Sequence, residues 1–518
     1  MKSMTNDDIA AVDDDNVEDE RPAAPIDDLE LRTTISVLES IVENRGRLAH
    51  LDSETRQRLL EAAGRISRPS RAEQRKLAKE LRRKDKRASR VAEEQILDAT
   101  GIRVGRKASV FQTPEPTNVL PPPAVSSDEP APEVRDARKC YVCKQEFRRI
   151  HFFYDQLCPS CAEFNYQKRL QTADLRGRVA IVTGARVKIG YQAAICLLRA
   201  GARVIVTTRF PHDAALRYAR ETDYEAWADR LEIFGVDLRF TPAVERFARF
   251  VNGYLPRLDF ILHNACQTVR RPPGFYAHLL EVEAAPLEAL PPLARPFVKR
   301  YATEKQLPAT PNDALFADPA RLSQLNLTAE DHALTGRMEL FPQGRLDQDL
   351  QQVDMREKNS WRLTLAEVPT VELLEVYLVN AVAPFVMSSK LKGLMMREPS
   401  RDKHIVNVSA VEGQFYREHK TDKHPHTNMA KAALNMLTRT SAQDYVKDGI
   451  HINSVDTGWV TDEDPVAIAS RKQAEHGFHP PLDIVDGAAR ICDPIFSGFA
   501  TGVHPFGQFF KDYKPTPW

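Results

Sequence analysis

Four cysteines in the first third of the chain are the residues whose spacing most directly predicts chemistry. Cys140 and Cys143 form one pair and Cys158 and Cys161 form a second, in the pattern C-x2-C-x14-C-x2-C. Two tight turns with this spacing can present four thiolates tetrahedrally to a zinc ion. A closed shell of thiolates leaves no coordination position for a substrate, so the sequence predicts a structural zinc site.

His151 lies between the two pairs and could replace one cysteine as a ligand. Because aromatic residues surround it, we favour a partly buried histidine that does not bind metal. The helix-forming stretch after Cys161 puts the second pair at a helix start, as in treble-clef-like fingers. The total of seven cysteines is odd and suits metal ligation in a reducing compartment better than a disulfide framework.

A loop with two glycines is the second candidate site. In "VAIVTGARVKIGYQAAICLL", Gly184 and Gly190 lie between a predicted strand and a predicted helix, and another strand is expected over residues 203–208. The backbone amides of such a loop, together with the helix N-terminus, can hold a pyrophosphate. Two glycines after a strand are a weak signal by themselves, so the assignment depends on later motifs.

The later segments resemble, in order, the landmarks of the short-chain dehydrogenase/reductase family. "TGARVKIG" resembles the family's TGxxxGxG loop, "DFILHNAC" its NNAG segment, and "NMAKAALNML" its catalytic helix. The resemblance covers about residues 173–516 and implies an α/β fold with a Rossmann-type doubly wound parallel sheet. The residues expected to contact a dinucleotide are Thr183, Gly184, Arg186, Lys188, Ile189, Gly190, Arg209, Asp237, Leu238, Asn264, Ala265, Lys431, Gly458 and Val460.

Three positions in these motifs depart from the family pattern. Lys188 stands where the middle glycine of the loop belongs, and His263 and Cys266 flank the retained Asn264 and Ala265. Asp237 stands at the position whose residue, in the family, contacts the adenine of the dinucleotide.

Cations near the predicted phosphate sites favour NADP over NAD. Arg209 ends the second predicted strand, where an acidic residue would instead hydrogen-bond the ribose of NAD. Arg186 and Lys188 add positive charge in the glycine loop. We therefore expect three cations around the extra phosphate of NADP.

The family's proton donor is missing. Its tyrosine precedes the catalytic lysine by four residues, and four residues before Lys431 the chain has Thr427, whose hydroxyl is too weak an acid. The usual serine position holds Ala410, one residue after Ser409. The resemblance therefore retains Lys431 and Asn380 from the family's four catalytic residues.

Other groups could supply the proton. Tyr416 precedes Lys420 by four residues, on the loop before the catalytic helix, and His424 and His426 lie just before that helix. The candidate catalytic residues are Lys431, Asn380, Ser409 and Tyr416.

The remaining segments divide the chain. We expect a disordered acidic tail at 1–26, a helical region at 27–112 that contains a strongly basic helix, and a Pro-rich linker at 113–137. A zinc-finger-like unit at 138–172 precedes the family-like domain at 173–518. A long insertion at about 268–366 could form a lid or bind a partner.

Composition limits the classes of function. The 72 basic and 72 acidic residues cancel, no apolar run suggests a membrane span, and the acidic N-terminus is unlike a signal peptide. We expect a cytoplasmic protein. The basic helix lacks interleaved aromatic residues, which disfavours nucleic acid.

Three functions are in competition. The favoured one is an NADP-dependent oxidoreductase with a non-standard active site, acting on a small carbonyl or alcohol. The alternative is a catalytically silent NADP-binding scaffold, and a nucleic-acid-binding protein ranks third. The family also commonly pairs through the helices that carry Asn380 and Lys431, which would give a homodimer unless the insertion blocks or replaces that surface.

Overall fold

The computed structural model describes residues 27–115, 131–305, 318–337, 339–416 and 420–518. The predicted acidic tail and the middle of the predicted linker lie outside these ranges. The chain divides into two compact units, with the boundary between Glu94 and Gln95, and each is described by itself.

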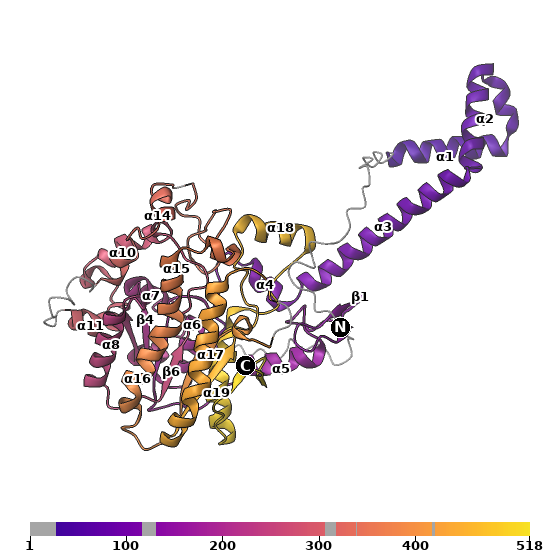
Figure 1. Cartoon of the computed structure of the whole chain (residues 1–518). Coiled ribbons are helices and arrows are strands. Elements are labelled where there is room, and N and C mark those ends of the chain that lie inside the picture. Colours follow the sequence, from indigo (N-terminus) through magenta and orange to yellow (C-terminus); the bar gives the residue numbers. More distant parts are fainter. Residues whose placement is uncertain (1–26, 116–130, 306–317, 338, 417–419) are drawn as a thin grey trace. The chain divides into compact units, whose positions relative to one another are not determined.

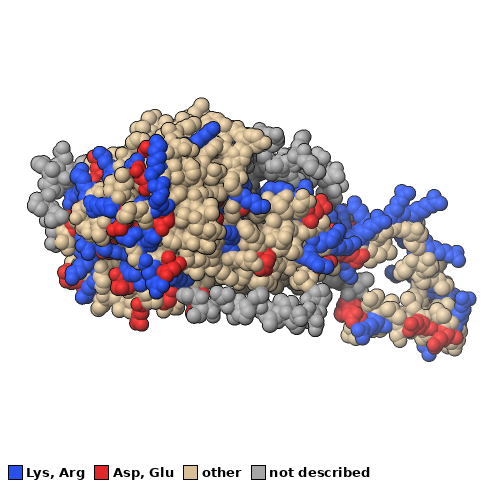
Figure 2. Space-filling model, turned by 90° about the horizontal axis from the view of Figure 1, so that it is seen from below, with Lys and Arg blue, Asp and Glu red and all other residues tan. Residues whose placement is uncertain are grey.

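The first unit consists of helices, as predicted. Its helices are α1 (Asp28–Glu43), α2 (Ser53–Ser67) and most of α3 (Arg71–Asp98). Asp27 and Asp52 begin the first two helices by accepting hydrogen bonds from the backbone N–H groups of Leu29 and Thr55. No side chain of α1 or α2 is buried. Lys and Arg side chains gather along α3 (Figure 2).

The cysteine-containing unit is a small hairpin followed by a helix. Strand β1 (Glu133–Lys139) pairs antiparallel with β2 (Glu146–Arg149), and α5 (Pro159–Arg169) follows. β1 begins inside the segment that the sequence assigns to the linker. Helix α4 (Gly101–Lys107) precedes the hairpin in the chain.

An eight-stranded sheet forms the core of the second unit, in the order β10-β9-β8-β7-β6-β3-β4-β5. Its strands are β3 (Val179–Thr183), β4 (Arg203–Thr208), β5 (Leu231–Gly235), β6 (Phe260–His263), β7 (Lys403–Ser409), β8 (Ile450–Asp456), β9 (Phe509–Lys511) and β10 (Lys514–Thr516). All neighbours are parallel except β9 and β10. A row of isoleucines crosses the sheet in register: Ile205, Ile181, Ile261, Ile405 and Ile452.

Helices cover both faces of this sheet, so the predicted Rossmann-type doubly wound fold is confirmed (Figure 1). The principal helices are α6 (Lys188–Arg199), α7 (Pro211–Tyr218), α8 (Thr241–Tyr254), α15 (Thr370–Tyr377), α16 (Ala383–Met395), α17 (Pro425–Tyr445), α18 (Val466–His476) and α19 (Ile484–Thr501). The isoleucine row packs under α8 and α16, whereas α6 and α19 cover the opposite face.

The continuous helix Thr370–Met395 is long and apolar enough to cross a membrane by length and composition alone. It consists of α15, the π-helical turn η8 (Leu378–Val382) and α16. Met387, Leu391 and Leu394 are fully buried against the sheet. These contacts are those of a core helix of an α/β fold.

The insertion folds into short helices beside the β5 edge. They are α9 (Pro273–Tyr276), α10 (Leu280–Ala284), α11 (Arg295–Lys305), α13 (Pro319–Leu322) and α14 (Ala329–Leu334). A buried ion triad attaches it to α15: Arg270 binds both oxygens of Asp331 at 2.5 and 2.7 Å and Glu375 at 2.8 Å. The insertion is therefore fixed to the domain through charged groups that have lost their contact with water.

Candidate functional site

The glycine loop forms a tight cradle at the carboxyl end of β3. Gly184 has a φ of +65°, and a Cβ there would lie 2.8 Å from Cα of Ala265. A Cβ on Gly190 would lie 2.2 Å from the side-chain nitrogen of Asn264. That nitrogen donates to the carbonyl oxygens of Thr183 at 3.1 Å and Gly184 at 3.2 Å. Glycine is therefore required at both positions, and Asn264 fixes the loop.

Lys188 occupies the place of the family's middle glycine and has a φ of +57°, in the left-handed region that favours glycine. Its ammonium lies 3.9 Å from the Glu463 carboxylate. Burial acts to lower the pKa of Lys188, but the charges of Glu463, Asp349 and Asp347 outweigh this effect and raise the pKa. Helix α6 begins at this lysine, so its N-terminus lies in the cradle.

Residues 345–353 of the insertion, here called the acidic hairpin, lie beside the glycine loop. A bridge joins Leu346 to Gln352, and the Asp347 carboxylate accepts the N–H of Asp349 at 2.9 Å. Arg217 of α7 donates to the carbonyl oxygens of Asp349 and Leu350 at 2.8 and 2.9 Å. Asp347 and Asp349 were not predicted, because no local motif marks a loop that reaches this site only through the folded insertion.

Two of the three predicted phosphate-binding cations have carboxylate neighbours. Arg186 forms an ion pair with Asp213 at 2.7 Å, and Lys188 faces the carboxylates described above. The expectation of three cations available to one phosphate is corrected accordingly, because a guanidinium paired with its own carboxylate is largely neutralised.

Arg209 differs from the other two cations. Within the described ranges it has no carboxylate in ion-pair contact, and its Nη2 donates to the Tyr276 hydroxyl at 2.6 Å. Its guanidinium also lies 4.5 Å from the centre of the Tyr276 ring. Burial acts to raise the pKa of Tyr276, but Arg209, Arg271 and Arg186 outweigh it and lower the pKa. Tyr276, from the insertion, was not predicted.

The predicted adenine position is buried and already hydrogen-bonded. The Asp237 carboxylate pairs with Arg239 at 2.7 Å, and Arg239 continues to Glu375 at 2.9 Å. Burial acts to raise the pKa of Asp237, but Arg239 lowers it overall. Leu238 is also buried beside it. The Asp237 carboxylate therefore already has a charged partner within the protein.

The candidate catalytic residues Lys431, Asn380 and Ser409 are all buried. Lys431 Nζ donates to the carbonyl oxygen of Val408 at 2.8 Å. The hydroxyls of Ser409 and Thr427 are buried and have no hydrogen-bond partner. Unpartnered hydroxyls at a strand end and a helix start are what a polar ligand would satisfy.

Asn380 lies in the π-helical turn η8, a type of distortion that often marks functional sites. Its amide contacts the backbone N–H and carbonyl of Gln267, both at 3.3 Å. The turn therefore connects the helix of Asn380 to the segment that follows the Asn264 loop.

The three alternative proton donors differ in burial. Tyr416 is 75% exposed, so its ring lies in solvent. His424 stacks on Trp361 at 3.9 Å, and burial, with the nearby His426, lowers its pKa to about 4. His426 is buried, and its Nε2 lies 3.3 Å from Glu372 on α15, although without hydrogen-bond geometry. Glu372 was missed, because its place in the sequence carries no motif.

The loop after β8 closes the predicted coenzyme site. The carboxylate of Asp456, at the end of β8, accepts the N–H groups of Gly458 and Val411, both at 2.8 Å. Burial raises the pKa of Asp456. Val460 is buried, and Glu463 on the same loop faces Lys188. The loop after β8 and the glycine loop, which are distant in the sequence, thus meet at the contact between Glu463 and Lys188.

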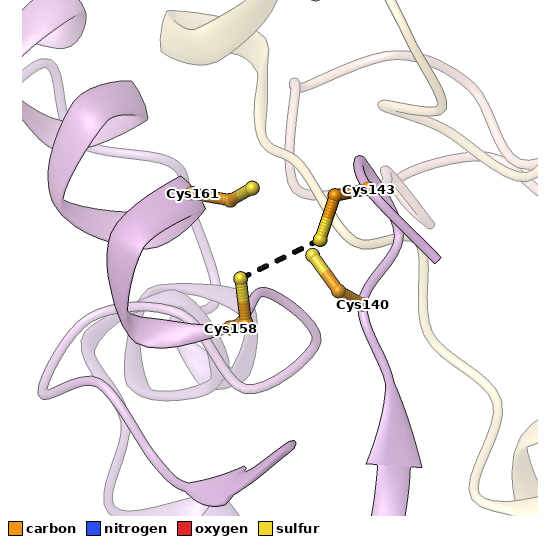
Figure 3. Close-up of side chains that lie close together, drawn as sticks. All are labelled: Cys140, Cys143, Cys158 and Cys161. Carbon is orange, nitrogen blue, oxygen red and sulfur yellow. Dashed lines mark hydrogen bonds between the residues drawn. The ribbon is translucent and has the colours of Figure 1, made fainter. Parts of the chain in front are cut away.

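The four cysteines converge on one point, as Figure 3 shows. Their ligand atoms all lie within 4.8 Å of one another, and the sulfurs of Cys143 and Cys158 are 3.7 Å apart. Cys158 is the N-cap of α5, which confirms that the second pair lies at a helix start. His151 lies outside the group, among Phe152, Tyr154 and Tyr166. This arrangement is compatible with a zinc ion.

Comparison with known proteins points to one family. The family described as short chain dehydrogenase matches residues 178–278, and the family described as Enoyl-(Acyl carrier protein) reductase matches residues 344–480. An uncharacterized protein of Acanthamoeba polyphaga mimivirus is 30% identical over 370 residues, which are 69% of this chain and 71% of that protein.

Two further matches are partial. The Bos taurus protein Dehydrogenase/reductase SDR family member 13 is 30% identical over 168 residues, 32% of this chain and 42% of that protein. The solved Pseudomonas aeruginosa RhlG/NADP active-site complex is 18% identical with a TM-score of 0.40, over 65% of this chain and 95% of that one.

Proposed function

Because the chain belongs to the short-chain dehydrogenase/reductase family, we propose that it is an NADP-dependent oxidoreductase with a non-standard active site. The observation that carries the proposal is the tight cradle of Gly184, Gly190 and Asn264 at the end of β3, in a chain that also buries Lys431 against the carbonyl of Val408 on β7. A Cβ at either glycine would collide with Ala265 or Asn264, so only glycine allows the tight loop whose backbone amides we propose to hold a pyrophosphate. The substrate class that we propose is a small carbonyl or alcohol.

In this reaction, each of several residues of the chain would have its own role. Bound NADP would donate or accept a hydride at its nicotinamide. Ser409 Oγ, which has no partner, would donate a hydrogen bond to the substrate oxygen. Lys431 and Asn380 would hold the surrounding polar groups in place. We assign the transfer of the proton to or from the substrate oxygen to His426. This residue is buried immediately before Thr427 and has Glu372 beside it.

Coenzyme preference would depend on Arg209, whose guanidinium Tyr276 holds in place. Its charge has no carboxylate in ion-pair contact among the described residues, so it could pair with the additional phosphate of NADP. Removing a hydrogen-bond donor to a charged group costs about 1.5–3 kcal/mol. We therefore expect Arg209→Ala to weaken NADPH binding about tenfold to a hundredfold and to leave NADH binding unchanged.

Titration of nicotinamide fluorescence, with turnover of a carbonyl panel followed in the same samples, would measure this effect. Arg220→Ala is a matched control, because Arg220 is an exposed arginine outside the cradle. Equal affinity of the unmodified chain for NADPH and NADH would contradict the coenzyme assignment. Failure to bind either nucleotide would contradict the proposed function as a whole.

A silent NADP-binding scaffold is the second candidate. It is favoured by Thr427 at the tyrosine position and by the exposure of Tyr416. NADPH binding without turnover of any compound in the panel would support this alternative. A gain of reductase activity in Thr427→Tyr would show that the rest of the active site remains competent.

We also propose that the four-cysteine group holds a structural zinc ion, with Cys140, Cys143, Cys158 and Cys161 as ligands. Metal analysis of the purified chain should find about one zinc ion per chain. Cys143→Ser should lose the metal, whereas Cys266→Ser should keep it, because Cys266 is an exposed thiol outside the group. Full zinc content in Cys143→Ser would rule out this ligand set.

The partners that we propose follow from exposed surfaces. Leu374, Phe385, Met429 and Met436 on α15, α16 and α17 are each at least 49% exposed, which supports pairing of two copies through these helices. The insertion and the exposed apolar residues of α1 and α2 could bind another protein. Separately, we propose that the protein is cytoplasmic. No observation favours nucleic acid over these partners.

A further inference from the structure

The cysteine unit shares a hydrophobic core with the predicted coenzyme site. Cys140, Tyr154 and Leu157 are buried in one cluster with Val460 and Leu482, which lie far away in the sequence. Ile189 of the glycine loop packs against the same cluster. Val460 and Ile189, which are predicted to contact the coenzyme, therefore pack on the cysteine unit and not only on the sheet.

A direct hydrogen bond reinforces this packing. Tyr141 lies inside the first cysteine pair, and its hydroxyl accepts the backbone N–H of Trp459 at 3.0 Å. The preceding Gly458 has a φ of +75°, and a Cβ on it would lie 2.5 Å from Leu482 and 3.3 Å from the Tyr141 hydroxyl. We name residues 458–464 the coenzyme-side loop. Its first turn is thus held between Tyr141 and Leu482.

The cysteine unit also holds the segment that follows α18. Arg169 of α5 binds both oxygens of Asp483, at 2.5 and 2.7 Å, and Asp483 is the N-cap of α19. The hydroxyl of Tyr154 donates to Asp486 at 2.5 Å. Gln156 donates to the carbonyl oxygen of His479 at 2.6 Å. The chain is therefore attached to the cysteine unit both at the start of the coenzyme-side loop and near the start of α19.

We propose that the zinc unit is a clamp for the coenzyme-side loop and that Tyr141 is a positioning residue for dinucleotide binding. A unit of this size has little core of its own, so the order of its first cysteine turn depends on the metal. Tyr141 belongs to that turn and transmits its position to Trp459 and Val460. Metal occupancy and dinucleotide affinity are then coupled, and each ligand raises the affinity for the other. This inference rests on the proposed binding of zinc and NADP.

The test uses the full, zinc-loaded chain with Tyr141→Phe, which keeps the ring and removes the hydroxyl. Because one neutral hydrogen bond is lost, NADPH should bind about threefold to tenfold more weakly, with the zinc content unchanged. Hydrogen exchange of the Trp459 amide should accelerate by a similar factor. Tyr166→Phe is the control, because Tyr166 belongs to the same unit and its ring packs on Phe152 and Phe153.

Two outcomes would overturn the clamp: unchanged exchange at Trp459 in Tyr141→Phe, or unchanged exchange of residues 458–464 after the metal is removed by a chelator. Neither readout requires coenzyme. If the unmodified chain bound no NADPH, the proposed function would fail, while exchange at Trp459 would still decide whether the clamp exists. Slower zinc release in the presence of NADPH would confirm the coupling in the opposite direction.

Discussion

His426→Gln is expected to lower kcat about a hundredfold or more while NADPH still binds with its original affinity. General acids and bases in active sites contribute roughly 10²- to 10⁴-fold to the rate. Glutamine fills a similar volume and can donate a hydrogen bond, but it cannot release a proton. Single-turnover measurements with NADPH and the best substrate of the carbonyl panel would separate this loss from an effect on binding.

Two further variants test whether His426, rather than Tyr416, exchanges the proton with the substrate. Tyr416→Phe should retain full activity, because its ring is 75% exposed. Glu372→Gln should lower kcat by less than His426→Gln does, because Glu372 acts only through its charge, 3.3 Å from the imidazole and without a hydrogen bond to it. Loss of activity in Tyr416→Phe together with a fully active His426→Gln would exchange the roles of these two residues.

Arg270→Met is expected to destabilise the second unit by about 3–5 kcal/mol, because it leaves buried carboxylates without their counter-charge. Arg270 is 6% exposed, and its partners Asp331 and Glu375 are 1% and 4% exposed. Burial acts to lower the pKa of Arg270, but the two carboxylates outweigh it and raise the pKa. Denaturation in urea, followed by tryptophan fluorescence, would measure the change in the free energy of unfolding.

The matched control lies in the same insertion. Arg337 pairs with Glu339, but the two side chains are 54% and 61% exposed. Such surface pairs contribute about 0–1 kcal/mol, so Arg337→Met should be nearly neutral. Equal stability of Arg270→Met and the unmodified chain would show that the carboxylates find other partners or take up protons.

The parts of the fold that the sequence predicted are those with local signals. The strand, loop and helix around Gly184 carry the apolar runs and glycines that the backbone requires, and the structure has them at β3 and α6. The paired cysteines likewise have a local spacing that is typical of zinc sites. The doubly wound sheet followed from the family resemblance, which matched motifs along most of the second unit.

The rest of the site depends on contacts between distant segments. Through the insertion, Asp347 and Asp349 reach Lys188 and Tyr276 reaches Arg209, along a path that no local pattern describes. For the same reason, the sequence could not show that Arg186 is paired with Asp213. Lys188 at a glycine position was visible, but its contact with Glu463 was not, because Glu463 lies 275 residues later in the chain.

The position of the insertion also determines how the sheet can assemble during synthesis. β6 and β7 are neighbours in the sheet, yet the whole insertion and the helix of Asn380 separate them along the chain. The β3–β4 and β4–β5 pairings close short loops, and these pairings and the longer-range β3–β6 pairing can all form while the ribosome is still producing the remainder. The β6–β7 pairing must wait, so the edge of β6 stays open for the time needed to translate the insertion. We expect this interval to be when the nascent chain depends most on chaperones.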